Sequence, residues 1–274
     1  MADKLDGDAV PEYFSNPGTV ERWWSPDQGP LAFHYDAELA ILDDHLAVSP
    51  ALRVIDVGTG RGRFGLYMAK KGCEVVAVDI SREMLEVARG ASQEAGLSEK
   101  IRFREGSADA LEILDEGKFD LALCMELFDH LPDLERALAS MRSLLSPGGQ
   151  FVFTYVASES AYGILGNVYR WLRKRLNAQG VMISRTYSLP EIRRCLAAQG
   201  FELDEYFGVG VLCFNAQTRL FREGWLSRSI LALARAEARR WPYHRRSPWA
   251  RMGAHVVGIA RAKGESSPAP SAES

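Results

Sequence analysis

The chain contains little cysteine and no long uninterrupted apolar run. Its four cysteines are dispersed through 274 residues without a CxxC pair or other metal-ligand spacing, which argues against a disulfide framework and a cysteine-bound metal and favours reduced structural thiols. No apolar run reaches the length of a membrane span. The acidic residues 1–13 lack the apolar core of a secretion signal, and no transit peptide is apparent, so a cytoplasmic protein is expected.

The modest net charge of −3 hides two parts of opposite sign. Residues 1–154 contain 15 lysines and arginines and 27 aspartates and glutamates, whereas residues 155–263 contain 18 and 7. The two parts therefore carry net charges of −12 and +11, an asymmetry that bears on partners rather than on fold. We expect the basic part to face a substrate or an anionic surface. No NPPY-like motif or recognised nucleic-acid-binding module occurs, so a nucleic-acid partner is not expected.

The most informative segment is RVIDVGTGRGRFG, from Arg53 to Gly65. Its first part has the pattern of a buried strand and carries an acid, Asp56, near its carboxyl end. The glycines that follow permit a tight turn against a ligand where a Cβ atom would clash; they are Gly58, Gly60 and Gly62. A strand, a glycine-rich turn and a helix start in this order predict a nucleotide-binding site.

Two nucleotides compete for this turn. GRGRFG also satisfies the dinucleotide pattern GxGxxG, and Asp79 ends the next predicted strand, where a ribose-binding acid is expected. Asp56 directly before the glycines favours a ligand with an ammonium group, since a pyrophosphate needs no anion there. A methionine-type cofactor is therefore favoured over NAD, with Asp56, Gly58, Gly60, Asp79 and the adjacent Ile80 as its predicted contacts.

Alternating strand and helix patterns predict an α/β fold. Helices are expected at 36–47, 64–71, 81–95, 134–145, 158–176 and 189–199, with further helix within 217–249. Strands are expected at 54–57, 74–79, 101–104, 119–124, 150–155, 201–208 and 255–262. The repeated alternation predicts a parallel sheet with helices on both faces.

This pattern resembles the class I S-adenosylmethionine-dependent methyltransferases. The similarity covers about Val54 to Lys263 and includes the segments GSADAL (Gly106–Leu111), FDLALCMELFDHLPD (Phe119–Asp133) and LLSPGGQFVFT (Leu144–Thr154). It implies a Rossmann-like seven-stranded sheet, in which the last predicted strand is antiparallel, and S-adenosylmethionine as the cofactor. It also implies that Ser107 and Ala108 lie at the adenine edge of that cofactor.

Within this superfamily the chain is similar to the ubiquinone-biosynthesis O-methyltransferases. CMELFDHLPD, Cys124–Asp133, is similar to that family's CMExxEHVPD, and Trp23-Trp24-Ser25-Pro26 with His34 is similar to its WWDPxG and LH. The NPxR that follows this histidine in the family is absent, so an arginine that contacts the cofactor is missing between Ala37 and Ala40.

The loop after the fourth strand supplies the candidate catalytic and metal-binding residues. His130 titrates near neutrality and is the candidate general base, with a structural role as the alternative. Glu126, Asp129 and His130 resemble the family's ExxEH group around a divalent ion and could hold Mg²⁺; a solvated loop is the alternative. The resemblance implies that Met125 contacts the cofactor, and core packing is the alternative.

The predicted organisation is an N-terminal arm or lid at 1–35, a methyltransferase domain at 36–263 and a disordered tail at 264–274. A helical cap is expected from insertions at about 156–185 and 214–252, where apolar residues at helical spacing lie beside arginines. We expect these apolar stripes to pack on the sheet. Peripheral contact of the basic cap with an anionic membrane at its inner face is the alternative.

The sequence therefore predicts an S-adenosylmethionine-dependent methyltransferase that acts on a small-molecule acceptor. The leading hypothesis is O-methylation of a hydroxylated aromatic or quinol-like compound, with or without a lipophilic tail. An amine, a sugar hydroxyl or a polyketide is the alternative acceptor, and an NAD-dependent oxidoreductase is favoured only by GxGxxG. The sequence leaves the oligomeric state open.

Overall fold

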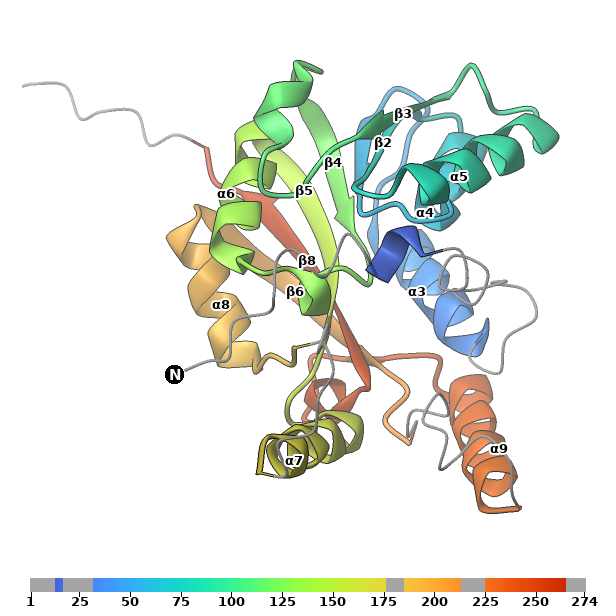
Figure 1. The fold of residues 1–274 in the computed structure, drawn as a ribbon, viewed down its shortest axis with the longest axis vertical. Coiled ribbons are helices and arrows are strands. Elements are labelled where there is room, and N and C mark those ends of the chain that lie inside the picture. Colours follow the sequence, from blue (N-terminus) through green and yellow to red (C-terminus); the bar gives the residue numbers. More distant parts are fainter. Residues whose placement is uncertain (1–12, 17–31, 176–184, 213–224, 265–274) are drawn as a thin grey trace, which may run out of the picture.

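The fold is built on one twisted sheet. The computed structural model describes residues 13–16, 32–175, 185–212 and 225–264. Its eight-stranded sheet has the order β3-β2-β1-β4-β5-β8-β6-β7, and helices lie on both of its faces (Figure 1). This arrangement confirms the predicted Rossmann-like α/β class.

Five neighbouring strands are parallel: β1 (Arg53–Val57), β2 (Glu74–Asp79), β3 (Ile101–Glu105), β4 (Phe119–Cys124) and β5 (Leu145–Val156). β1 pairs with β2 on one side and with β4 on the other. The strand order therefore reverses at β1, and ligands of open α/β sheets bind beyond the carboxyl ends of the strands at such a point.

The rest of the sheet is antiparallel. β8 (His255–Ala262) lies between β5 and β6 (Phe201–Val209) and is antiparallel to both, as the resemblance implied. The eighth strand, β7 (His244–Arg245), pairs with β6. The sequence predicted seven strands, because two residues are too few to show an alternating pattern.

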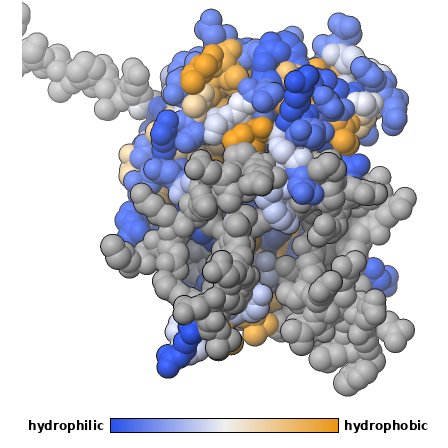
Figure 2. All heavy atoms as spheres, viewed as in Figure 1, coloured by the Kyte–Doolittle hydropathy of each residue, from blue (hydrophilic) through white to orange (hydrophobic). Residues whose placement is uncertain are grey.

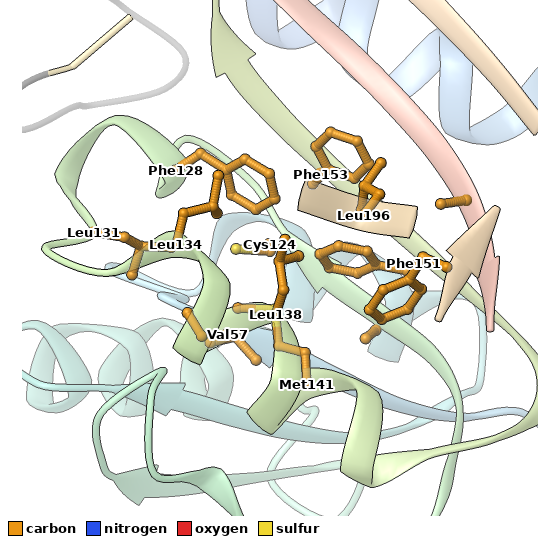
Figure 3. Packing of buried hydrophobic residues seen from close by; sticks show 14 of the residues in the cluster. Val57, Cys124, Phe128, Leu131, Leu134, Leu138, Met141, Phe151, Phe153 and Leu196 are labelled. Carbon is orange, nitrogen blue, oxygen red and sulfur yellow. The ribbon is translucent and has the colours of Figure 1, made fainter. Parts of the chain in front are cut away.

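Two apolar clusters cover the two faces of the sheet. On one face lie α3 (Ala32–His45) and α4 (Arg63–Lys70), and on the other lie α6 (Leu134–Leu144) and α8 (Leu189–Ala198). Figure 3 shows the second cluster, in which the ring of Phe128 stacks on that of Phe153 with centroids 4.7 Å apart. Since strand residues point alternately to either cluster, the central strands contribute apolar residues to both faces of the sheet.

Polar side chains define where the helices begin. Ser81 accepts a hydrogen bond from Met84 N at the start of α5 (Arg82–Glu94), and Asp133 accepts one from Arg136 N at the start of α6. Ser188 and Glu191 form a capping box at α8. Such caps satisfy the first N–H groups of a helix, which have no partner within it. The structure also contains three short 3₁₀ turns: η1 (Leu111–Leu114), η2 (Phe128–His130) and η4 (Trp249–Met252).

Two further helices lie apart from the sheet. α7 (Ala161–Arg175) follows the carboxyl end of β5, and α9 (Trp225–Arg240) contacts α3 (Figure 1). Ile164, Val168 and Leu172 on α7 are 52%, 49% and 44% exposed, so this apolar stripe does not pack on the sheet, contrary to the prediction. Hydrophilic residues dominate the coloured surface around α4 and α5, with separate hydrophobic groups between them (Figure 2). No described helix is long and apolar enough to cross a bilayer.

A glycine in the middle of β8 tests the packing of the sheet. A Cβ atom on Gly258 would lie 2.3 Å from Cζ of Phe153, whose ring is fixed by its stack on Phe128. We expect Gly258→Ala to lower the free energy of unfolding by about 1–3 kcal/mol through overpacking. Gly90→Ala in α5 is the matched control; with open space around its Cβ position, it should stabilise by about 0.5–1 kcal/mol. Equal unfolding midpoints in urea for the two variants would contradict this prediction.

Candidate functional site

A cavity of about 880 Å³ lies beyond the carboxyl ends of β1, β2 and β4. Its lining includes all eight residues predicted to contact the cofactor: Asp56, Gly58, Gly60, Asp79, Ile80, Ser107, Ala108 and Met125. Glu126 and His130 also line it. The structure therefore brings residues from four separate strand ends to one cavity.

The glycine turn after β1 is held against β2. The backbone N–H groups of Gly58 and Thr59 donate to the carbonyl oxygen of Val78 at 2.8 and 2.9 Å. Gly58 has a φ of +72°, and a Cβ atom there would lie 2.7 Å from Leu127. Gly60 also has a positive φ, of +52°. A side chain at Gly58 would thus be strained and would push on the loop after β4.

Asp56 stabilises the conformation of this turn. Its Oδ2 accepts hydrogen bonds from Thr59 Oγ1 at 2.6 Å and from Gly65 N at 2.9 Å. Burial raises the pKa of Asp56 to about 6, although both hydrogen bonds favour the charged form. The sequence assigned Asp56 to the ammonium group of the ligand; the structure gives it a second task, the shape of the turn.

Asp79 joins the glycine turn to the loop after β2. One carboxylate oxygen accepts from Gly60 N at 2.7 Å and the other from Ser81 N at 2.9 Å. Burial raises its pKa, and these hydrogen bonds oppose that shift. Ser81, and not Asp79, caps α5. The adjacent Ile80 is 40% exposed, which is unusual for an isoleucine beside a cavity and suits an apolar surface for a ligand.

Cofactor binding should depend on Asp79. Asp79→Ala is expected to weaken S-adenosylmethionine binding by about 1–3 kcal/mol, because the ribose hydroxyls and Gly60 N would lose a charged acceptor. Isothermal titration measures the change, with Asp109→Ala as control, since Asp109 lines the same cavity but bonds only Ser107 and the exposed Arg136. Unchanged affinity in Asp79→Ala would remove the carboxylate from the ribose site.

The remaining predicted contacts differ in character. Ser107 donates its hydroxyl to Asp109 at 2.6 Å, so its side chain is engaged within the loop, and both Ser107 and Ala108 line the cavity. Met125 is 4% exposed and belongs to an apolar cluster as well as to the cavity wall. Core packing and a cavity surface, proposed from the sequence as alternatives, therefore coexist at Met125.

His130 ends η2 and is almost fully buried at the cavity wall. Its Nε2 lies 3.4 Å from Oδ2 of Asp129. The ring of Phe14 meets it edge-to-face with centroids 5.1 Å apart. A histidine oriented by a neighbouring carboxylate is the usual arrangement of a general base.

Glu126 is not grouped with Asp129 and His130, the other two residues of the predicted magnesium site. Its Oε2 forms a 2.6 Å ion pair with Arg63, and its Oε1 lies 3.8 Å from Nδ1 of His255. Among the described residues, the group whose ligand atoms lie within metal-binding reach is Glu38, Glu126 and His255, without Asp129 or His130. Arg63 at 2.6 Å disfavours a further cation there, so nothing in this geometry supports magnesium.

The charged side chains that lie beside Glu126 were not predicted from the sequence. Glu38 is fully buried, and its Oε1 lies 3.4 Å from Nδ1 of His255. Arg63 lies over the ring of Tyr35, with 4.8 Å from Cζ to the centroid. The only sequence signals were an acid inside the apolar pattern of a helix and an arginine inside the glycine motif. The predicted lid residues Trp23 and Trp24 lie outside the described residues.

Comparisons with known proteins identify the family of this chain. A family model described as a methyltransferase domain matches residues 31–206. The chain is 31% identical over 193 residues to the ubiquinone biosynthesis O-methyltransferase of Xanthomonas euvesicatoria, covering 69% of this chain and 80% of the relative. The ubiquinone biosynthesis O-methyltransferase of Azotobacter vinelandii is 27% identical to the chain over 208 residues, which cover 75% of this chain and 87% of the relative.

Solved structures show the same fold. A SAM-dependent methyltransferase from Thermotoga maritima aligns with a TM-score of 0.62 and 22% identity, over 93% of this chain and 100% of that one. Magnesium protoporphyrin IX methyltransferase from Synechocystis, solved with bound SAH, aligns with a TM-score of 0.60 and 17% identity over 94% and 100%. The glycine turn, with its positive φ angles, and the acid at the end of β2 suit such a cofactor. The chain therefore belongs to the methyltransferase-domain family and is an S-adenosylmethionine-dependent methyltransferase.

Proposed function

We propose that this enzyme O-methylates a hydroxylated aromatic or quinol-like small molecule. The observation that carries this proposal is the 31% identity to a ubiquinone biosynthesis O-methyltransferase across four fifths of that protein. The cavity wall supports it: Phe14 and Tyr35 offer aromatic surfaces, and Leu127 and Leu131 offer apolar ones. Flat aromatic acceptors are favoured by such walls.

S-adenosylmethionine supplies a methyl group that is already activated by its sulfonium, so the protein mainly has to position the acceptor. In the proposed reaction the acceptor oxygen bonds to the methyl carbon, the carbon–sulfur bond breaks, and the sulfur keeps the electron pair. His130 takes the hydroxyl proton on the ring nitrogen that does not face Asp129, and Asp129 stabilises the imidazolium. Phe14 packs edge-to-face against the ring and restricts its orientation.

An acceptor panel tests the proposal. Purified enzyme with S-adenosyl-[methyl-²H₃]methionine should transfer label to catechols or to quinols with isoprenoid tails, detected by mass spectrometry. Labelling of amines, sugars or polyketides alone would replace the acceptor class, and NAD retained on purification would replace the cofactor. Activity should survive EDTA, because Glu126 is paired with Arg63; loss on chelation and return with Mg²⁺ would restore the metal hypothesis.

We also propose that α7 contacts an anionic membrane surface. Its apolar residues are about half exposed, including Leu165 at 49% and Leu172 at 44%. The sequence of α7 contains four basic residues and no acid. Arg175 lies 5.5 Å from the ring centroid of Trp171. Exposed apolar residues, an aromatic and basic residues on one helix are typical of interfacial helices, and a lipophilic acceptor would be reached from such a surface.

Vesicle binding measures this contact. The protein should sediment with anionic vesicles at low salt, remain unbound with neutral ones, and dissociate as salt rises, because each basic residue contributes about 1 kcal/mol and is screened within a Debye length. Trp171→Ser should reduce binding, while Trp249→Ser on η4, equally exposed, serves as the control. Protein that stays in the supernatant with both lipids would contradict the proposal.

A further inference from the structure

The methyl donor brings one anionic group into a cavity rich in acids. S-adenosylmethionine carries a sulfonium, an ammonium and a carboxylate. Asp56, Asp79 and Glu126 line the cavity and suit its hydroxyl and cationic groups. The family arginine expected shortly after His34 is absent, and α3 instead places the buried Glu38 in that stretch. The carboxylate therefore needs a cation from another element.

Arg63, the first residue of α4, meets that need by position. It lines the cavity directly after the glycine turn, and its side chain is only 14% exposed. Of the other arginines and lysines that line the cavity in the described chain, Lys70 is exposed to solvent, and Arg61 has the same intermediate burial as Arg63 and is therefore compared with it below.

The guanidinium of Arg63 is held in place by its neighbours. Glu126 Oε2 lies 2.6 Å from Nη2, and the rings of Tyr35 and Phe64 lie 4.8 and 5.4 Å from Cζ. Glu126 itself has a φ of +55°, and its N–H donates to Thr154 Oγ1. A non-glycine residue in this left-handed region is costly, so the surrounding structure must hold the backbone of Glu126 in place.

The guanidinium of Arg63 interacts with more than one carboxylate. Burial works against its charge, but the carboxylates of Glu126 and Glu38 raise the pKa of Arg63 above its ordinary value. His255 lies between the same two carboxylates, at 3.4 Å from Glu38 and 3.8 Å from Glu126. Glu126 is thus shared between two cations, so it does not claim Arg63 alone. A guanidinium has five N–H donors and can bind more than one carboxylate.

We propose that Arg63 binds the carboxylate of S-adenosylmethionine and replaces, from the start of α4, the arginine that the sequence lacks after His34. The inference rests on the methyl donor of the proposed function. It assigns to Arg63 the recognition of the amino-acid end of the cofactor. It also gives a reason for the largely buried arginine at the start of α4, because the backbone conformation of the turn does not require an arginine there.

Decarboxylated S-adenosylmethionine isolates this contact, because it differs only in the carboxylate. We would measure dissociation constants of both ligands by titration calorimetry. Wild-type protein should prefer the intact cofactor about 10- to 100-fold. Arg63→Met should abolish most of that preference mainly by weakening the intact cofactor, and Arg63→Lys should keep part of it. Arg82→Met is the matched control, since it removes an exposed arginine that is paired with Glu86 on α5.

Arg63→Met leaves Glu126 without its ion-pair partner, so Arg63→Met/Glu126→Gln is measured beside it to remove both charges together. A preserved preference in both variants would overturn the proposal, as would a preference lost in Arg61→Met instead. Equal weakening of both ligands in both variants would assign Arg63 to the shape of the site and also overturn it. Wild-type protein that binds neither ligand would instead contradict the proposed function.

Discussion

Alanine at His130 is expected to lower turnover about a hundredfold or more while the cofactor still binds. His130 is buried at the cavity wall, paired with Asp129 at 3.4 Å, and a positioned base contributes about 10²–10⁴-fold to the rate. Steady-state kinetics with the acceptor found in the panel measures kcat, and calorimetry confirms cofactor binding. Asp129→Asn should cause a smaller loss, because the imidazole would keep its place but lose the charge that stabilises its protonated form.

His244→Ala is the matched control for this experiment. His244 is also partly buried and also pairs with a carboxylate, Glu237, at 3.3 Å, but it lies on β7 at the far edge of the sheet. Its removal should leave turnover unchanged. If His130→Ala keeps wild-type turnover across neutral pH, proton transfer belongs to another group or to solvent.

Much of the fold was predictable because its signals are local. The strands β2, β4 and β8 have the predicted limits, since each is a short apolar run bounded by turn residues or charges. α3 was the least accurate helix: it begins at Ala32, four residues before the predicted start. Its first turn carries Phe33 and His34, which pack inside the protein and so do not show the polar start that marks a helix in sequence.

The cofactor end of the site was predictable for the same reason. Gly58, Gly60 and Asp79 lie at the ends of adjacent strands, so their order along the chain already predicts their meeting in space. The charged group around Glu126 was not predictable. Glu126 is a sequence neighbour of Asp129 and His130, which suggested a metal group, but its positive φ turns the chain there, and its side chain pairs with Arg63 and His255.

Contacts between distant residues explain that failure. Glu38 and His255 are separated by 217 positions, and β8 inserts between β5 and β6 before they can meet. No periodicity or motif encodes such a pair. A buried acid in α3 is visible in sequence only as a charge at an apolar position, which is equally the pattern of a helix edge.

Two histidines next to this group, His34 and His255, should make the free energy of unfolding depend on pH in opposite directions. Burial alone would lower the pKa of His255, but its hydrogen bond to Glu38 and the charges of Glu126 and Glu38 raise it to about 9. Burial, together with the charge of His255, lowers the pKa of His34 to about 3. The rings of the two histidines lie 5.6 Å apart, and Nε2 of His34 has no hydrogen-bond partner among the residues that the structure describes.

The sign follows from the protons bound by the folded and unfolded chains. The unfolded pKa of both histidines is about 6.5. The stabilisation from His255 is therefore complete below pH 6.5 and is lost as pH rises to about 9, on the order of 3 kcal/mol in all. The stabilisation from neutral His34 is complete above pH 6.5 and is lost as pH falls toward 3.

Urea unfolding of variants between pH 4 and 9.5 separates the two contributions. His255→Asn keeps a donor for Glu38 but cannot carry the charge, so it should lower the stability at pH 6 by a few kcal/mol and flatten the curve between pH 6.5 and 9. His34→Asn should leave that alkaline slope intact and flatten the acid limb, since asparagine does not titrate. Removing His255 also changes the pKa of Glu38 and of His34, so the His255 contribution is taken from the alkaline limb of His255→Asn and the His34 contribution from the acid limb of His34→Asn. Parallel curves for wild type and both variants would contradict the buried charge assigned to His255 and the buried neutral form assigned to His34.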